Sequence, residues 1–416
     1  MSLIFRLAWR NIWRNPRRTV LTLAAIAFAA TVLVFFVGLQ MSSYDASIQA
    51  TVSVFNGEVQ IQRDGYLKRP TLRKSFSNSI ELKKQILSSG LAKFATRRSF
   101  GFALFSSETR AFGAQIVGVE PESEKELSTI PQLVKKGRYL KPSDENAVVV
   151  GQDLAANLNV EVGSEINYIG QARDGSLAAN VLEVVGIFRS GSRDIDRAMV
   201  QIPISVFDTD FAMEGDVHSI VLSNKDVKHV SEMAAALNAF LVRTAEGDEA
   251  NQTLLLHTWE DLMPGLRQSI DLDMASSWLF YLSLVFVVNF GILNTFLMSV
   301  LERTKEFGTM LALGAKPSSI SGLILFECSL LTFIGLVLGV ALGSLVILYY
   351  GVYGFSIPGS EAILEEWNLP TAVKTKLSWS ALTAGPLIIF VAGTLSAVYP
   401  ALKIYKIVPA DALKSY

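Results

Sequence analysis

The chain has few of the residues from which catalytic and metal centres are usually built. It carries one cysteine, Cys328, and three histidines that lie far apart in the sequence, His218, His229 and His257. A single thiol cannot close a disulfide within the chain, and isolated histidines with one cysteine do not suit a zinc site. We therefore expect no metal site, and we interpret the histidines as packed or surface residues.

Motifs that bind nucleotides or hydrolyse substrates are also missing. No glycine is followed directly by lysine, which excludes a Walker A phosphate-binding loop, and no G-x-S-x-G nucleophile elbow occurs. The 37 basic and 38 acidic residues leave a net charge of −1, which does not indicate nucleic-acid binding. We expect no catalytic residue and no cofactor in this chain, and we interpret its scattered Asp and Glu pairs as solvated surface.

Long apolar stretches, in contrast, are abundant. Residues 19–44, 274–301 and 377–402 contain no charged side chain, and residues 317–360 contain one ionisable residue, Glu327. Each stretch exceeds the ~20 apolar residues that a transmembrane helix needs, and four buried helices this long and uncharged would be unusual in a soluble protein. The sequence therefore predicts a membrane protein with four transmembrane α-helices and a large α+β extracytoplasmic domain inserted between the first and the second.

The expected segments follow from these stretches and from the polar block of about 230 residues between the first two. They are a cytoplasmic amphipathic helix at 1–16, transmembrane helices at 17–44, 274–301, 317–350 and 377–402, the extracytoplasmic domain at 45–273, a short cytoplasmic helix at 302–316, a short extracytoplasmic loop at 351–376 and a cytoplasmic tail at 403–416. The first apolar stretch is too long for a cleaved signal peptide. Because its helical pattern continues through Tyr44, Ile48 and Val52, we expect a helical stalk there, and a second stalk at 259–271.

Basic residues set the expected orientation. The loop between the third and fourth spans carries Glu361, Glu365 and Glu366 against two lysines, whereas the other flanks are basic. The basic flanking residues are Arg6, Arg10, Arg14, Arg17 and Arg18 before the first span, Arg303, Lys305 and Lys316 between the second and third, and Lys403, Lys406 and Lys414 after the fourth. The positive-inside rule therefore predicts that both termini and segment 302–316 are cytoplasmic and that the large domain is outside.

The first fifteen residues predict a helix that lies in the membrane interface and ends before Pro16. Its apolar face and its basic stripe are formed by Phe5, Ala8, Trp9, Ile12 and Trp13 and by Arg6, Arg10 and Arg14, respectively. The residues leave open whether this helix is a membrane anchor only or also contacts a partner.

The large domain is predicted to mix short strands with helices. Apolar runs and alternation predict strands at 58–62, 102–105, 147–150, 165–169, 182–188 and 198–202. Helical spacing joins Ile80, Ile86, Leu87, Leu91 and Phe94, and also Val227, Val230, Met233, Leu237 and Leu241. We expect a β-rich subdomain at about 135–223, inserted between two halves of an α+β subdomain at about 45–134 and 224–273.

The cytoplasmic segment 302–316, ERTKEFGTMLALGAK, begins with charged residues and then places Phe307, Met310 and Leu311 on one helical face. A short rigid helix between two spans can pass a push from a soluble partner into both spans. Composition alone leaves this interpretation and that of a plain juxtamembrane loop equally open.

Four parts of the chain resemble the permease subunits of the MacB/LolC/FtsX-type ABC transporters. They are the basic entry LAWRNIWRNPRRTVLTL at 7–23, the outer-domain core VVVGQDLAANLNVEVGSEINYI at 148–169 with VVGIFRSGSRDIDRAMVQIP at 184–203, the coupling helix ERTKEFGTMLALGAKPSSI at 302–320 and the closing segment AVYPALKIYKIVPADAL at 397–413. Each part alone is weakly specific, but all four occur in order and with the expected spacing over nearly the whole chain.

The resemblance implies a mechanical transmitter in the bacterial inner membrane. Two permease copies, or two related permeases, would work on a dimer of cytoplasmic ABC ATPases, which bind the ATP and Mg. Membrane lipid and a periplasmic carrier or adaptor are further implied partners. By position, the element that docks on the ATPase would be formed by Glu302, Arg303, Glu306, Gly308, Leu311, Gly314 and Ala315.

Two differences between this chain and other members of the family indicate its substrate class. Efflux members of the MacB kind carry a fused ATPase domain, and FtsX division proteins have a much smaller outer domain, so this chain is most similar to the lipoprotein-releasing subunits. The resemblance thus implies extraction or export of lipoproteins or lipids from the inner membrane. The alternatives are a tripartite efflux component for peptides or drugs and an FtsX-like activator of a periplasmic hydrolase. An apolar cavity between the spans, open to the outer leaflet, would favour lipid handling.

Two features of the third span remain. Gly335, Gly339 and Gly343 repeat the small-residue spacing that lets helices approach closely, which we expect to serve packing within the subunit rather than dimerisation. Glu327 is costly at membrane depth, so it should face protein or water, in a structural or coupling role.

Overall fold

The computed structural model describes residues 3–245, 254–359, 364 and 371–408. The acidic residues Glu361, Glu365 and Glu366 of the predicted loop, and the end of the predicted tail with Lys414, lie outside the described residues. The chain divides into two compact units. The helical unit comprises residues 1–44, 269–356 and 372–416, and the α+β unit comprises residues 45–268 and 357–371.

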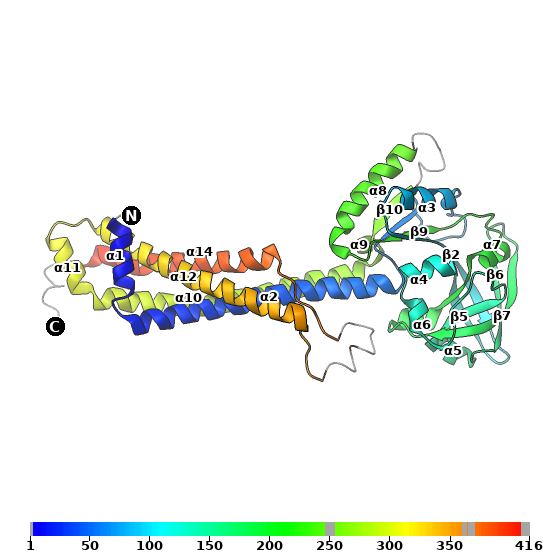
Figure 1. Ribbon diagram of the computed structural model, residues 1–416, viewed down its shortest axis with the longest axis horizontal. Helices are drawn as coiled ribbons and strands as arrows, with labels where there is room; N and C mark the ends of the chain where they lie inside the picture. Colours follow the sequence, from blue (N-terminus) through cyan, green and yellow to red (C-terminus); the bar gives the residue numbers. More distant parts are fainter. Residues whose placement is uncertain (1–2, 246–253, 360–363, 365–370, 409–416) are drawn as a thin grey trace. The chain divides into compact units, whose positions relative to one another are not determined.

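The helical unit contains four helices that are long and apolar enough to cross a membrane. They are α2 (Pro16–Val54), α10 (Pro264–Glu302), α12 (Pro317–Tyr353) and α14 (Trp379–Lys403), and they run alongside one another (Figure 1). The short helices α1 (Leu3–Ile12) and α11 (Thr304–Ala312) lie at the same end of this unit, and η4 (Ile404–Lys406) follows α14 (Figure 1). The prediction of four long apolar helices is confirmed.

Two of these helices extend well beyond the predicted spans. Helix α2 continues past Tyr44 to Val54, as the repeat of apolar residues predicts, and α10 begins at Pro264. The second predicted stalk is interrupted, because α9 (Trp259–Leu262) ends at Met263, where the backbone leaves helical geometry before Pro264 starts α10.

The three glycines of α12 face α2. A Cβ at Gly335 would lie 2.7 Å from Ile26, one at Gly339 would lie 2.5 Å from Ala30, and one at Gly343 would lie 2.9 Å from Val34. The Thr31 hydroxyl also donates to the Gly339 carbonyl oxygen at 3.1 Å. The small residues therefore let the α2 and α12 backbones approach closely within one chain, with a side-chain hydrogen bond to backbone added at the contact.

The α+β unit is built on one ten-stranded sheet, counted over the described residues. Its strands are β1 (Val59–Arg63), β2 (Phe94–Ser106), β3 (Ala111–Val119), β4 (Val134–Gly137), β5 (Ala147–Gly151), β6 (Glu165–Gln171), β7 (Leu177–Phe188), β8 (Met199–Pro203), β9 (Ser219–Ser223) and β10 (Leu254–Thr258). Helices α3 (Ser79–Ser88), α4 (Pro121–Leu127), α5 (Gln152–Leu158), α6 (Arg193–Ala198), α7 (Ile204–Asp210) and α8 (Val230–Ala245), with the 3-10 turns η1 (Ile130–Leu133) and η2 (Val227–His229), complete the unit.

Six of the strands close into a barrel, in the order β2-β3-β8-β5-β7-β6 and back to β2. The other part of β2 pairs with β9, which continues to β1 and β10. The pairing pattern therefore differs from the predicted boundaries near 135 and 223. Strands β2 and β3 lie before the first boundary yet belong to the barrel, whereas β9 lies inside the second boundary yet pairs outside the barrel.

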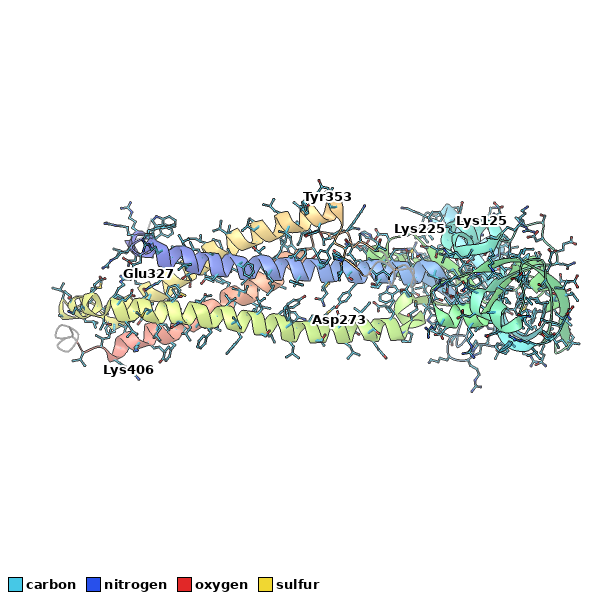
Figure 2. The ribbon with its side chains drawn as sticks, turned by 90° about the horizontal axis from the view of Figure 1, so that it is seen from below. Lys125, Lys225, Asp273, Glu327, Tyr353 and Lys406 are labelled. Atoms are coloured by element: carbon cyan, nitrogen blue, oxygen red, sulfur yellow. The ribbon has the colours of Figure 1, made fainter. Side chains whose placement is uncertain are left out.

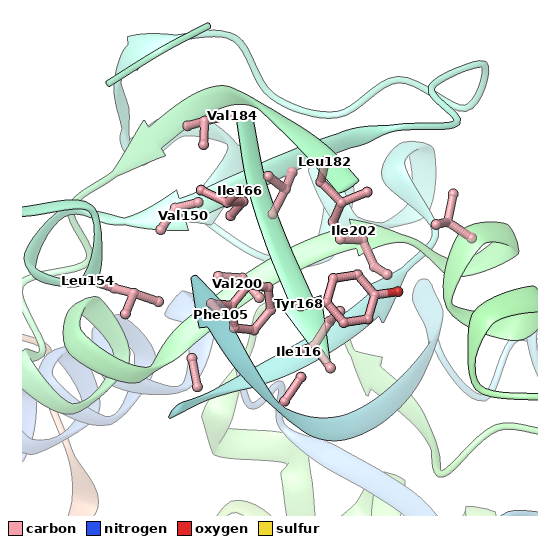
Figure 3. Packing of buried hydrophobic residues seen from close by; sticks show 14 of the residues in the cluster. Phe105, Ile116, Val150, Leu154, Ile166, Tyr168, Leu182, Val184, Val200 and Ile202 are labelled. Atoms are coloured by element: carbon pink, nitrogen blue, oxygen red, sulfur yellow. The ribbon is translucent and has the colours of Figure 1, made fainter. Parts of the chain in front are cut away.

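Alternating apolar side chains fill the barrel. Figure 3 shows Phe105, Ile116, Val150, Tyr168 and Leu182 directed toward a common interior, and all of them are buried. Full burial of one such side chain contributes about 1.5–3 kcal/mol, so this interior is the main source of stability that the unit has without a disulfide.

Two sequence expectations for this unit are wrong in detail. Helix α3 ends at Ser88, and Phe94 instead starts strand β2, because Gly90, with a φ of +72°, turns the chain between them. The acidic residues are also not all solvated. Glu124 is fully buried and receives two hydrogen bonds from the buried Arg98, and buried Glu58 accepts the backbone N–H groups of Asn224 and Asp226.

Candidate coupling site

The predicted coupling segment folds as a short helix between two sharp changes of direction. Helix α10 ends at Glu302, and Arg303 leaves helical geometry before α11 begins at Thr304. At the other end Gly314 adopts a φ of +91°, which favours glycine, and its N–H donates to the Leu311 carbonyl. Pro317 then occupies the first turn of α12.

The apolar face of α11 is turned into the helical unit. Phe307 is 1% exposed and packs in a cluster with residues of α10, α12, α14 and η4, namely Val300, Ile320, Ile324, Ala401 and Ile404. Leu311 and Ala315 pack at the edge of this cluster, and Gly308 is buried beside it. Helix α11 therefore contacts the ends of three long helices at once.

A different set of residues faces away from the bundle. Leu313 is 84% exposed, Met310 is 37% exposed, and Lys305, Thr309 and Gly314 are exposed as well. Met310, which helical spacing groups with Phe307 and Leu311, is the most exposed of these three residues of α11, and Leu313 was not among the predicted site residues. The exposure of Leu313 could have been predicted from its position, because this apolar residue lies outside the Phe307–Leu311 stripe and directly before the turn at Gly314.

Charged residues connect this segment to the rest of the unit. The Arg303 guanidinium lies 3.2 Å from a carboxylate oxygen of Glu306 and 3.2 Å from one of Glu327, and it lies over the Phe307 ring with its central carbon 5.0 Å from the ring centroid. Glu327 itself is 7% exposed. It therefore faces protein partners, as the cost of burying a lone charge requires. Glu327 lies toward the same end of the unit as Lys406 (Figure 2).

The N-terminal residues supply the remaining partners. Asn11, near the end of α1, donates its side-chain amide to Glu327, and Arg14 pairs with Glu306. Arg18, in the first turn of α2, pairs with Glu302 at 2.8 Å. Three of the residues predicted to dock on an ATPase, Glu302, Arg303 and Glu306, thus make contacts within the chain. A small polar cavity of about 140 Å³ lies among these side chains.

The carboxylate of Glu306 is held in its charged form. The hydrogen bond from Arg14 lowers the pKa of Glu306, and Arg303 adds a hydrogen bond and a second positive charge in the same direction. The contact with Arg14 is therefore an ion pair at neutral pH.

Apolar cavities lie between α2 and α10. The larger has a volume of about 710 Å³ and extends from Arg18 to Phe280, with Phe28, Val287 and Gly291 among its lining residues. Its lining thus runs from Arg18, near α11, to Phe280, close to the opposite end of the span 274–301 of α10. A smaller cavity of about 130 Å³, lined by α14 as well, lies toward the other end of the spans beside Gln40, whose side-chain oxygen Oε1 accepts a hydrogen bond from the Tyr281 hydroxyl at 2.6 Å.

The histidines make no site. His218 is buried and hydrogen-bonded, and His229 is exposed and pairs with Asp226. His257 lies in β10. Within the described ranges, no group of His, Cys, Asp or Glu side chains is arranged to hold a metal ion.

These features define a multi-pass membrane protein with four apolar spans, a short helix packed between two of them, and a large α+β domain after the first. The family follows from comparison with known sequences. The model of the MacB-like periplasmic core domain matches residues 19–240, and that of the FtsX-like permease C-terminal domain matches residues 278–409. The chain belongs to the ABC transporter permease family that combines these two domains, whose permeases are non-catalytic.

Individual relatives are distant. The chain is 24% identical over 284 residues to an uncharacterized ABC transporter permease of Methanocaldococcus jannaschii, covering 68% of this chain and 65% of the relative. It is 21% identical to the lipoprotein-releasing system transmembrane protein LolE of Haemophilus influenzae, over the full length of both. It is 23% identical to the pyoverdine export ATP-binding/permease protein PvdT of Pseudomonas aeruginosa, covering 81% of this chain but half of that protein.

Among solved structures, the chain resembles the periplasmic region of MacB from Actinobacillus actinomycetemcomitans. The two are 14% identical, the match covers 54% of this chain and 98% of that structure, and the TM-score is 0.36.

Proposed function

We propose that this chain is the permease subunit of an ABC transporter in which a separate cytoplasmic ATPase binds ATP and Mg and drives α11. The observation that carries the proposal is the placement of α11. Its buried face contacts α10, α12 and the end of α14 through Phe307, while Leu313 projects away from the bundle. A partner that binds Leu313 and displaces α11 would therefore move three spans together.

The proposed orientation has both termini and α11 in the cytoplasm, in a bacterial inner membrane. Arg14, Arg18, Arg303 and Lys305 gather at the end of the helical unit that holds α1 and α11, in agreement with the positive-inside rule. The motion of α11 would be transmitted to the α+β unit through α2 and α10, because each of these helices has residues in both units.

For the substrate we propose lipoproteins or lipids. Relatives named as lipoprotein-releasing proteins match over most or all of the chain, and apolar cavities lie between α2 and α10. The larger cavity reaches Phe280 in the part of α10 remote from α11, and the smaller one lies beside Gln40, so both extend toward the end of the spans that the proposed orientation places at the outer leaflet. A second permease, as a copy or a paralogue, and a periplasmic carrier or adaptor complete the proposed assembly.

A role as a tripartite efflux component for peptides or drugs is the second candidate function. PvdT, named as a pyoverdine exporter, matches 81% of this chain. Activation of a periplasmic hydrolase remains the alternative in which nothing is moved. The proteins that copurify in mild detergent distinguish the three, because a lipoprotein carrier, an efflux adaptor and a hydrolase are different partners.

The Leu313→Asp substitution tests the proposed ATPase contact. A carboxylate at an exposed position costs the free chain little, but it would be desolvated without a partner in the docked complex. We expect the variant to insert normally and to lose at least about tenfold of the ATPase that copurifies with the wild type. The matched control is Leu177→Asp, at a position of the α+β unit that is 71% exposed. Normal ATPase binding by Leu313→Asp would show that α11 is not the docking element.

Leu311 belongs to the docking element predicted from the sequence, and we expect the Leu311→Asp chain to insert but to be uncoupled from the ATPase. Leu311, however, packs at the edge of the Phe307 cluster. We therefore expect this variant to lower the unfolding temperature as well, which Leu313→Asp should not do. Full ATP-driven activity of the Leu311→Asp chain would argue against the proposal.

A further inference from the structure

The N-terminal helix has two faces with different surroundings. Trp9 and Trp13 are each 44% exposed, and Arg6 and Arg10 are exposed on the same side, which suits a helix at the membrane interface. The opposite side is buried by protein. Ala8 and Ile12 are almost fully buried, and Ile12 packs in the same apolar cluster as Cys328 of α12. A membrane anchor alone would need only the first of these faces.

The buried side carries polar contacts that an anchor does not require. Glu327 accepts a hydrogen bond from Asn11 and a charge-assisted contact from Arg303. A carboxylate this deep in a transmembrane helix is stable only with such partners. Its surroundings are complete only when α1, the turn between α10 and α11, and α12 are all in place.

Two further ion pairs join the same elements nearer the surface. Arg14 connects the turn between α1 and α2 to Glu306 of α11, and Arg18 connects the first turn of α2 to Glu302 at the end of α10. The Thr19 hydroxyl donates to the Ile12 carbonyl, which fixes the end of α1 against the start of α2. Residues 11–18 are thus bonded to both sides of the turn at Arg303 that precedes α11, through Glu302 and Glu306.

We propose that α1 and residues 11–18 form a brace that holds α11 and links its motion directly to α2, in addition to the spans on either side of it. The proposal rests on the proposed function, in which α11 receives the motion of an ATPase. Asn11, Arg14 and Glu327 are positioning residues in this scheme, because they act through Arg303 and Glu306. Displacement of α11 then reaches α2, the helix that continues into the α+β unit, through Arg14 and Arg18.

A charge exchange tests the brace. Arg14→Glu and Glu306→Arg each bring like charges together. The double variant restores an ion pair between positions 14 and 306 with the two charges exchanged. The complex with its ATPase is reconstituted in lipid, and two quantities are measured: the ATP hydrolysis rate, and the ATP-dependent change in hydrogen exchange at residues 45–54 of α2. We expect Arg14→Glu, at a position outside the predicted docking element, to keep the bound ATPase and its hydrolysis but to lose most of the exchange change, by about fivefold or more. Glu306→Arg should lose the exchange change as well. The double variant should recover at least half of it.

The control is Arg10→Glu, which makes the same charge change on the exposed side of α1. We expect it to leave the exchange change intact. Full coupling in both single variants, or no recovery in the double variant, would overturn the brace. Loss of the bound ATPase in Arg14→Glu would place Arg14 in the ATPase contact instead, which also overturns the brace.

A second measurement keeps the brace testable if no ATPase binds and the proposed function itself fails. Cys328 is the sole cysteine, is fully buried and follows Glu327. Ile12 at the end of α1 packs in the same apolar cluster as Cys328, so the rate at which a thiol reagent labels Cys328 in the detergent-solubilised chain reports on the docking of α1. We expect Arg14→Glu to raise this rate severalfold and the double variant to return it to the wild-type value. An unchanged rate in Arg14→Glu would contradict the brace independently of any ATPase.

Discussion

At the scale of single residues, the α+β unit buries a neutral imidazole. His218 Nδ1 accepts the Phe100 N–H at 3.0 Å, and Nε2 lies 3.2 Å from the Leu72 carbonyl oxygen, to which it can donate. Burial lowers the pKa of His218 from 6.5 to about 4, and Arg173 adds a positive charge that acts in the same direction. Protonation would remove the lone pair that accepts from Phe100, so the folded unit excludes the charged form.

This histidine should make the α+β unit acid-sensitive. Because its folded pKa lies below its unfolded pKa, the unfolded chain binds more protons between these two values, and stability falls as the pH drops through that window. The expected loss at about pH 5 relative to neutral pH is about 2 kcal/mol. The His218→Gln variant should lack this contribution. Thermal unfolding, followed by the β-sheet signal in circular dichroism, measures the difference, and an equal pH dependence of both chains would contradict the assignment.

Single-residue environments were only partly predictable from the sequence. The cost of a lone charge in a span was enough to predict that Glu327 faces protein. Nothing in the sequence indicated that Glu124 would be buried against Arg98, because the two residues are joined only when α4 packs on β2. Local composition reports how polar a segment is, whereas burial of one side chain depends on the tertiary partner that covers it.

At the scale of elements, the contact between α2 and α12 depends on glycine. A Cβ at Gly339 would lie 2.6 Å from the Ala27 carbonyl oxygen as well as 2.5 Å from Ala30, so the clash involves backbone that cannot rotate away. A Cβ at Gly322 of the same helix would meet nothing within 4 Å. These two positions therefore separate the effect of close packing from the effect of replacing glycine in a helix.

We expect Gly339→Ala to destabilise the helical unit by about 1–3 kcal/mol, since α12 must shift away from α2. Gly322→Ala should be neutral or slightly stabilising, because alanine favours the helix. Thermal exposure of the Cys328 thiol to a fluorogenic reagent measures unfolding of this unit in detergent. Equal unfolding temperatures for both variants would show that the glycines are not a tight contact.

The elements themselves were more predictable than their partners. Short apolar runs and alternation placed strands at β5, β6 and β8 within a residue or two of their ends, because both patterns report the local environment directly. The orientation of α11 was predicted only in part. Phe307 is buried and Leu311 packs at the edge of the cluster, but Met310 beside them is 37% exposed, because the long helices around α11 cover only part of its apolar surface.

At the scale of the whole molecule, the closure of six strands into a β-barrel could not be derived from the sequence. The pairing of β6 with β2 joins residues 103–106 to 167–170, and no local pattern encodes a contact at that separation. The order of apolar spans and polar blocks, in contrast, fixed the number of long helices and the position of the inserted domain, because a span is long enough to be recognised by itself.

The orientation in the membrane is the whole-molecule property on which the proposed function depends. Cysteine substitutions measure it in a Cys328→Ala chain, which has no other thiol. Ser176 lies exposed at the turn between β6 and β7, and Thr309 lies exposed on α11. In cells whose outer membrane is permeabilised and whose inner membrane is intact, we expect a membrane-impermeant maleimide to label Ser176→Cys. It should label Thr309→Cys only after the inner membrane is opened. Labelling of Thr309→Cys from outside would put α11 beyond the reach of a cytoplasmic ATPase and would reject the permease mechanism proposed for this chain.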